Sequence, residues 1–487
     1  MVKCAKLCYG LSMQIPSKQY LKKHWRPLAL VVLLLVTLPL SIPLAQHAWE
    51  WVTGASYQAA AIVVDTSHQN GPVRPIWMGV AQGFEKKEGE DFRLTATVPY
   101  MRAVGVKYVR IDHLYDGYGV VSRGADGRLT YNWTKLDAMV SDIVSAGATP
   151  YFSLSYMPDV ISHSDILDYP NNWNEWGQVV GATVAHYSRD YRGGLPNVIY
   201  EVWNEPDLFG GWKASYTDKN YQQLYSVASN AAVSVRGAKP FQIGGPATTG
   251  FYTSWVDGFY NKLDSTVRID FFSWHRYSTD VQQFVSDVQQ AQQLIAPKIS
   301  KAQSIYISES GVSSDKGSQY DGRWAAAHYL AVNLALENSV ADMVMPFEVM
   351  DDANGQTQFH GGWGMLTNPA YGAVVPKPRY RAMQLLSQMT GMQLPHVGDG
   401  TYVTALAARD PSGVIRVLAV NYDPSGTHQE IFPLALANLA DGVYTVQEQY
   451  LSGRTVSNDI SISSGVALQR QIVLTSSDAV LVTVTKR

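Results

Sequence analysis

The chain has 487 residues, 46% hydrophobic and 16% charged, a composition that excludes wholesale disorder and fibrous repeats. At about 100 to 250 residues per domain, this length predicts two or three domains. Residues 51–487 carry 32 Lys and Arg against 40 Asp and Glu, and this negative balance argues against a nucleic-acid partner.

The N-terminus combines a basic cluster with an apolar run. Residues 1–27 carry six Lys and Arg, and residues 28–45 form a run of 18 residues without a charge. Because about 20 apolar residues span a bilayer and basic residues stay in the cytoplasm, we expect 28–45 to cross the cytoplasmic membrane once, behind a cytoplasmic tail at 1–27. The rest of the chain then lies on the periplasmic or extracellular side. Cleavage of 28–45 as part of a signal peptide, giving a secreted protein, is the alternative.

Strand and helix patterns alternate eight times over residues 73–393. The apolar β-type runs are 76–80, 106–111, 151–154, 198–203, 241–245, 269–274, 304–307 and 343–347. Between the second and third runs, apolar residues from Leu136 to Val144 recur on one helical face, and Gly147 stands where a helix would end. This alternation predicts an α/β protein with a (β/α)8 TIM barrel. A doubly wound sheet is the rival, but no Gly-x-Gly-x-x-Gly turn follows the first run.

Residues 394–487 have a different pattern. From about residue 401, alternating apolar and polar residues replace the helices, and Asp-Pro-Ser-Gly turns occur at 410–413 and 423–426. We predict a C-terminal β-sandwich that braces the barrel, with a dedicated sugar-binding module as the alternative. Residues 46–72 are a predicted linker, in which the apolar stretch 60–64 is a candidate strand for the sandwich.

Two glutamates directly follow apolar strands of the predicted barrel. Glu205 follows the fourth strand and Glu309 the seventh. The active site of such a barrel lies at the carboxyl ends of its strands, so both carboxylates are expected to face one pocket. Hydrolysis of a glycosidic bond requires such a pair, because one group protonates the leaving oxygen while the other attacks or activates water.

The segment 201–208, with sequence Glu-Val-Trp-Asn-Glu-Pro-Asp-Leu, resembles the acid/base strand of the retaining glycosidase clan whose catalytic glutamates lie on strands four and seven. Within this clan the chain is most similar to glycoside hydrolase family 39, which includes β-xylosidases, α-L-iduronidases and bacterial exopolysaccharide hydrolases. Further matching motifs occur in order at 154–158, 244–247, 359–364 and 376–382. The eighth strand, 345–352, departs from the tryptophan-rich strand usual in these relatives.

The resemblance implies roles for the central residues of the site. Glu205 is the expected general acid/base and Glu309 the nucleophile. Asn204 is expected to contact the sugar 2-hydroxyl, and Arg110 to support the charge of the nucleophile. His275 and Tyr277 on strand six match the clan's His-x-Tyr pair, in which the Tyr hydroxyl contacts the nucleophile. Three further substrate-binding residues are expected from position alone. His113, just past strand two, is expected to reach a sugar hydroxyl, with a structural hydrogen bond as the alternative, and Trp212 and Trp363, on loops that should face the pocket, suit stacking on pyranose rings.

These observations predict a retaining glycosidase that acts on a carbohydrate substrate, with an envelope exopolysaccharide cut at internal bonds as the expected reaction. The alternatives are an exo-acting, β-xylosidase-like glycosidase and a non-catalytic barrel that binds glycan in an envelope assembly. A metal-dependent hydrolase is disfavoured because the 11 histidines form no His-x-His or His-Glu-x-x-His pattern, so we expect no metal and no cofactor. The membrane, contacted through 28–45, is the other expected partner, and the sequence indicates no particular protein partner.

Overall fold

The computed structural model of the protein describes residues 57–84, 92–215, 217–295, 304–463 and 465–487. The predicted cytoplasmic tail and the predicted membrane-crossing segment, 28–45, lie outside these residues. Within the described ranges, no helix has both the length and the apolar composition that a membrane span requires. Residues Ala59–Arg487 form one compact unit, which is described below.

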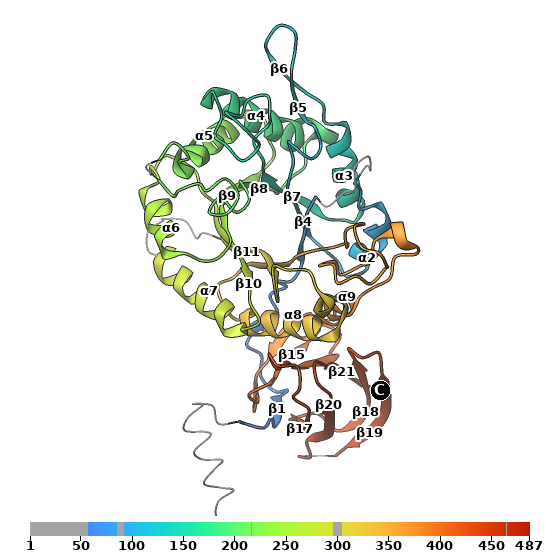
Figure 1. Ribbon diagram of the computed structural model, residues 1–487. Helices are drawn as coiled ribbons and strands as arrows, with labels where there is room; N and C mark the ends of the chain where they lie inside the picture. The colour runs from blue at the N-terminus through green and yellow to red at the C-terminus, as the bar shows by residue number, and fades with distance from the viewer. Residues whose placement is uncertain (1–56, 85–91, 216, 296–303, 464) are drawn as a thin grey trace, which may run out of the picture. The chain divides into compact units, whose positions relative to one another are not determined.

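Eight parallel strands form one sheet in the order β12-β11-β10-β9-β8-β7-β4-β3. Val344 N in β12 donates to the carbonyl of Ile76, just before β3 (2.9 Å), and Val349 N, just after β12, donates to the carbonyl of Ala81 in β3 (3.0 Å). These bonds hold the two edges of the sheet together. The predicted (β/α)8 barrel is therefore confirmed, and Figure 1 shows helices encircling the strands. The strands are β3 (Gly79–Gln82), β4 (Tyr108–Ile111), β7 (Thr149–Leu154), β8 (Val198–Val202), β9 (Phe241–Thr248), β10 (Phe271–Tyr277), β11 (Ser304–Gly311) and β12 (Met343–Pro346).

The barrel helices bury the apolar faces that the sequence pattern indicated. In α3, Leu136, Met139, Val140 and Ile143 are buried, and Gly147 follows the helix with a left-handed φ of 84°. The helices are α2 (Val98–Ala103), α3 (Thr134–Ser145), α4 (Trp173–Ala185), α5 (Tyr221–Ser234), α6 (Thr253–Gly258), α7 (Val281–Ile295), α8 (Arg323–Leu336) and α9 (Pro378–Leu386). A hairpin that the sequence analysis missed, β5 (Val121–Arg123) and β6 (Leu129–Tyr131), projects beyond the ring of helices (Figure 1).

The remaining strands form two sheets around a second apolar core. One sheet has the order β19-β18-β21-β16-β15-β13-β2 and the other the order β14-β1-β17-β20. The strand β1 precedes the barrel in sequence but pairs in parallel with β17, with Ile62 opposite Leu434. The strands are β1 (Ile62–Asp65), β2 (Gly71–Pro72), β13 (Met392–Leu394), β14 (His396–Val397), β15 (Val403–Arg409), β16 (Ile415–Asn421), β17 (Glu430–Ala437), β18 (Gly442–Tyr450), β19 (Thr455–Ile462), β20 (Leu468–Leu474) and β21 (Ala479–Lys486).

The interior of the barrel changes from apolar to charged along its axis. Large apolar side chains, among them Phe271, Tyr306 and Met343, pack together inside the barrel. Toward the carboxyl ends of the strands, the interior side chains include Arg110 and Glu201, both buried. Because a TIM-barrel interior is packed with side chains rather than open, the apolar layer forms a floor beneath the charged groups. The charged layer is where the chemistry is expected.

Candidate active site

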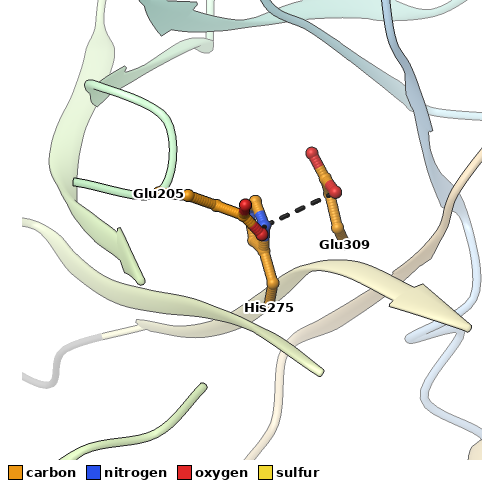
Figure 2. A group of neighbouring side chains, drawn as sticks. All are labelled: Glu205, His275 and Glu309. Atoms are coloured by element: carbon orange, nitrogen blue, oxygen red, sulfur yellow. Dashed lines mark hydrogen bonds and ion pairs between the residues drawn. The ribbon is translucent and has the colours of Figure 1, made fainter. Parts of the chain in front are cut away.

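Three ionisable side chains meet at the carboxyl ends of the strands. Glu205 follows β8, His275 lies on β10 and Glu309 lies on β11, and their side chains point toward one another (Figure 2). A carboxylate oxygen of each glutamate and a ring nitrogen of His275 all lie within 4.8 Å of one another. Retaining glycosidases hold their carboxyl groups about 5 Å apart, whereas inverting enzymes separate them by about 6.5–9.5 Å to admit a water molecule. The close approach of these carboxylates is therefore typical of the retaining geometry.

The pairing of β10 with β11 brings His275 beside Glu309. The register between the strands shifts after Trp274, and the shift places His275 opposite Glu309. Such irregularities re-aim side chains next to active sites. His275 Nδ1 lies 2.8 Å from Glu205 Oε1 and 3.4 Å from Glu309 Oε2, so one imidazole nitrogen faces both carboxylates.

The backbone around Glu205 fixes the direction of its side chain. Trp203 and Glu205 both have a left-handed backbone, with φ values of 71° and 45°. This conformation costs a residue other than glycine about 1–2 kcal/mol, so surrounding contacts must hold it. One such contact is the 3.0 Å hydrogen bond from Glu205 N to the carbonyl of Ala247, at the end of β9. Glu205 is thereby turned toward His275 and Glu309, and its side chain keeps 12% exposure (Figure 2).

Arg110 binds three side chains from two other strands. Its Nη1 donates to Glu309 Oε1 at 2.7 Å, its Nε donates to Glu201 Oε2 at 2.7 Å, and its Nη2 donates to Asn204 Oδ1 at 2.8 Å. The guanidinium is 1% exposed, and the carboxylates of Glu201 and Glu309 raise the pKa of Arg110 despite this burial. The planar group therefore stays charged and sets the positions of its three partners.

Glu201 is a buried carboxylate that the sequence analysis did not select as a site residue. It lies within β8, accepts a second hydrogen bond from the Tyr151 hydroxyl at 2.7 Å, and is fully buried. Burial alone would raise the pKa of Glu201, but the charges of Arg110 and His275 outweigh it and lower that pKa. The available signal was a charged residue inside an apolar strand, because such a residue requires a buried partner.

The electrostatics of His275 and Glu309 are linked. Burial disfavours the imidazolium of His275, but the carboxylates of Glu309 and Glu205 more than offset this and raise its pKa above 6.5. Burial raises the pKa of Glu309 above 4.5, and the nearby carboxylate of Glu205 adds to the rise against the lowering by His275 and Arg110. The Tyr277 hydroxyl donates to Glu309 Oε2 at 2.9 Å, a contact that stabilises the ionised carboxylate.

Asn204 and His113 are held by a network around Tyr156. Asn204 Nδ2 donates to the Tyr156 hydroxyl at 2.9 Å, and the Tyr156 backbone N–H donates to Asp116. His113 Nδ1 lies 2.6 Å from Asp116 Oδ2, and its ring meets the Tyr156 ring edge-on at 4.8 Å. With its side chain 31% exposed, His113 remains accessible at the edge of this network.

The two tryptophans predicted to stack on sugars have different positions. Trp363 is partly exposed and packs edge-on against Phe347, beyond the end of β12, at a centroid distance of 5.4 Å. Lys316 Nζ lies 4.3 Å from the centre of the Trp363 ring. Trp212 is only 1% exposed and packs against Trp203 at 5.2 Å. The prediction that Trp212 offers its indole face to a sugar is therefore wrong, because the loop folds this side chain into the core.

A metal ion could bind only in competition with the contacts just described. Within the described part of the chain, Glu205, His275 and Glu309 form the one cluster of at least three side chains whose donor atoms are close enough to share an ion. Glu309 already accepts hydrogen bonds from Arg110 and Tyr277. A permanently charged guanidinium directly on a ligand opposes a second cation at the same carboxylate.

The barrel and its paired carboxylates define a retaining glycoside hydrolase, and sequence comparison agrees. The chain belongs to glycosyl hydrolases family 39, whose sequence pattern matches residues 60–434. It is 27% identical over 346 residues to a β-xylosidase of Caldicellulosiruptor saccharolyticus, across 65% of this chain and 69% of that protein. It is 28% identical over 199 residues to a β-xylosidase of Geobacillus stearothermophilus, across 36% of this chain and 37% of that protein.

Solved structures show the same fold. The crystal structure of a monomeric β-xylosidase from Caulobacter crescentus CB15 superposes with a TM-score of 0.72 at 20% identity, covering 88% of this chain and all of that one. A family 39 enzyme from Xanthomonas axonopodis pv. citri gives a TM-score of 0.72 at 19% identity, covering 89% of this chain and 98% of the other. The expected family resemblance is thus confirmed.

Replacing the central arginine tests its structural role. In Arg110→Met, the buried carboxylates of Glu201 and Glu309 lose their counter-charge, and we expect the free energy of unfolding to fall by about 3–5 kcal/mol in urea titrations. Arg189→Met is the control, because Arg189 pairs with Asp190 where both side chains are about half exposed, and little change is expected. Equal losses in the two variants would contradict the assigned role.

The pH dependence of kcat/KM tests the contact between Tyr277 and Glu309. The predicted nucleophile acts when ionised, so activity rises as pH increases through its pKa. Tyr277→Phe removes a hydrogen bond to the ionised form, which raises that pKa and moves the acidic limb of the profile to higher pH by about one unit. Tyr306→Phe, which removes a hydroxyl bonded to Gln242, should leave the limb in place. An unmoved limb in Tyr277→Phe would count against this prediction.

Proposed function

We propose that the protein is an exo-acting, β-xylosidase-like glycosidase in which Glu309 is the nucleophile and Glu205 the acid/base. The observation that carries the mechanism is the approach of the two carboxylates within 4.8 Å beside the buried cation of Arg110. The similarity to two β-xylosidases supports xylose as the sugar released.

In the first step, a Glu309 oxygen attacks the anomeric carbon while the carboxylic acid of Glu205 protonates the leaving oxygen. The bond to the leaving group breaks, and a covalent glycosyl-enzyme forms. Arg110 and Tyr277 each donate to one oxygen of Glu309, so the attacking carboxylate is held in one orientation before the substrate binds. This fixed geometry lowers the barrier because little reorganisation remains during the reaction.

In the second step, Glu205 acts as a base. Having lost its proton, it removes a proton from a water molecule, whose oxygen attacks the anomeric carbon and releases Glu309. His275 Nδ1, 2.8 Å from Glu205 Oε1, orients this carboxylate in both steps. Because the imidazole also lies 3.4 Å from Glu309 Oε2, its charge stabilises whichever glutamate is ionised.

Asn204 is poised to contact the sugar ring. Arg110 donates to Asn204 Oδ1, which fixes the orientation of the amide, and one N–H of the amide donates to the Tyr156 hydroxyl. The second N–H of the amide is then available to the 2-hydroxyl of the sugar. A contact at this hydroxyl strengthens as the ring approaches the oxocarbenium-like transition state.

Cleavage of a polymer at internal bonds is less well supported than release of terminal sugars. The expectation of internal cleavage depended on Trp212 and Trp363 as stacking platforms on both sides of the catalytic pair. The burial of Trp212 removes one of these platforms. Of the two tryptophans, Trp363 alone remains partly exposed.

Product size over time distinguishes the two modes. With xylo-oligosaccharides as substrate, we expect xylose from the first minutes, because an exo-acting enzyme releases one terminal residue per productive encounter. Chromatography of timed samples measures this, alongside an envelope exopolysaccharide as the competing substrate. Early release of oligosaccharides from the polymer, without xylose from the short substrates, would overturn the proposal.

Substituting each of the two glutamates should impair a different step of the reaction. Glu309→Ala should lower turnover by about 10⁴-fold or more, and azide should restore part of it as a glycosyl azide of inverted anomeric configuration. Glu205→Gln should still form the glycosyl-enzyme from aryl glycosides, which need little protonation, but should hydrolyse it slowly. NMR of the products and burst kinetics provide the measurements. A Glu309→Ala enzyme with near-normal turnover would refute the assignment.

A further inference from the structure

Two exposed apolar residues follow the predicted acid/base within four positions. Leu208 is 60% exposed and Phe209 is 36% exposed, and we call this pair the 208–209 shelf. Exposed large apolar side chains are informative when they are fixed in place, because a fixed apolar surface costs little entropy to use in binding. The backbone contacts of the shelf decide whether its side chains are fixed in place.

The shelf is tied to the acid/base by its own backbone. The N–H groups of Leu208 and Phe209 both donate to the carbonyl of Glu205, at 3.0 and 2.7 Å. The Phe209 carbonyl in turn accepts a hydrogen bond from Trp203 Nε1 at 3.0 Å. The shelf and the carboxylate of Glu205 thus belong to one rigid turn at the end of β8.

The buried side chain of Trp212 packs against this turn at Gly210. Gly210 has a left-handed φ of 99°, and an added Cβ there would lie 2.4 Å from the Leu167 carbonyl and 2.7 Å from Trp212 Nε1. Only glycine permits the chain to reverse this closely over the indole. The reversal buries Trp212 and leaves Leu208 and Phe209 on the outside.

Contacts on either side place the shelf next to the sugar-binding groups. The Phe209 ring meets the Tyr156 ring at 5.8 Å, and the Tyr156 hydroxyl accepts from Asn204. On the other side of the turn, Asp207 accepts a hydrogen bond from Thr249 N at 3.0 Å. The Thr249 hydroxyl is bonded to that of Tyr252, a residue 42% exposed.

We propose that the 208–209 shelf binds the leaving-group sugar, with the Phe209 ring against the apolar face of a pyranose. This inference rests on the proposed function, in which Glu205 protonates the oxygen of the leaving group. Whatever donates that proton must touch the leaving group, so a rigid apolar surface on the same turn lies on that side of the scissile bond. Stacking on an aromatic ring suits a pyranose because one face of the sugar presents C–H groups.

The shelf should act again in the second step, when a sugar rather than water attacks the glycosyl-enzyme. The bond between Glu309 and the anomeric carbon breaks, a bond from that carbon to the acceptor oxygen forms, and the acceptor's proton passes to Glu205. A sugar acceptor occupies the position that the leaving group vacated, whereas methanol needs no apolar surface. The ratio of transfer to these two acceptors therefore reports on the shelf alone.

The experiment uses the full chain with an aryl β-D-xyloside as donor and methyl β-D-xyloside and methanol as competing acceptors. For Phe209→Ala we expect the ratio of sugar transfer to methanol transfer to fall about tenfold, because both acceptors compete for the same glycosyl-enzyme however fast it forms. Phe209→Trp should restore the ratio, because it keeps an aromatic face. Val233→Ala, which shortens a side chain 52% exposed on α5, controls for loss of exposed apolar surface and should behave as wild type.

The outcomes separate the shelf from the proposed function. An unchanged ratio in Phe209→Ala would overturn the shelf while leaving the glycosidase intact. A uniform loss of both transfers would also overturn it, because it would show a structural defect rather than lost stacking. If the wild type turns over no aryl xyloside, the proposed sugar fails, and an aryl glycoside that it does hydrolyse takes the place of the donor in the same measurement.

Discussion

The catalytic face depends on one buried cation. The Arg110 guanidinium reaches from β4 to Glu201 within β8, to Asn204 at its end and to Glu309 on β11, so a single planar group sets the spacing of side chains from separate strands. A lone charge at this depth would be costly, and so would either carboxylate without it. The ion pairs therefore make the geometry of the site inseparable from the stability of the barrel, and they explain why Glu201, which need not touch a substrate, is built into the strand.

Much of the fold could be predicted from the sequence because it follows from periodicity. Each of the eight apolar runs overlaps a strand, and the spacing of Leu136, Met139 and Ile143 gave the buried face of α3. The β5–β6 hairpin could not be predicted in this way, since its strands of three residues are too short to show an alternation. The stretch 60–64 could be predicted as a strand of the sandwich, but its pairing with β17 joins segments about 370 residues apart, and no local pattern encodes that partner.

The site residues, too, could be predicted only in part from the sequence. Glu205 and Glu309 could be found because each follows an apolar run, at the end of the barrel where the active site is expected. His275 could be found only through the family resemblance, because a buried histidine on a strand is more often part of the core. The prediction for Trp212 was wrong because the exposure of a loop side chain depends on how the loop folds back. That reversal depends on the left-handed backbone of Gly210, which the sequence alone does not reveal. Glu201 lies in the segment that carries the family resemblance, but its role depends on electrostatics. A charged side chain inside an apolar strand needs a buried partner, and only the structure identifies that partner as Arg110.

The hydrogen bond from Glu205 N to the Ala247 carbonyl has an evolutionary consequence. It fixes the proposed proton donor through a main-chain carbonyl at the end of β9, which any amino acid at position 247 can supply if it tolerates the left-handed backbone there, where φ is 55°. Side chains further along the loop after β8 can therefore be exchanged without moving the proposed proton donor. The preference for the leaving group can therefore change during evolution while the position of the catalytic carboxylates stays the same. This is one physical route by which a single fold comes to act on different substrates.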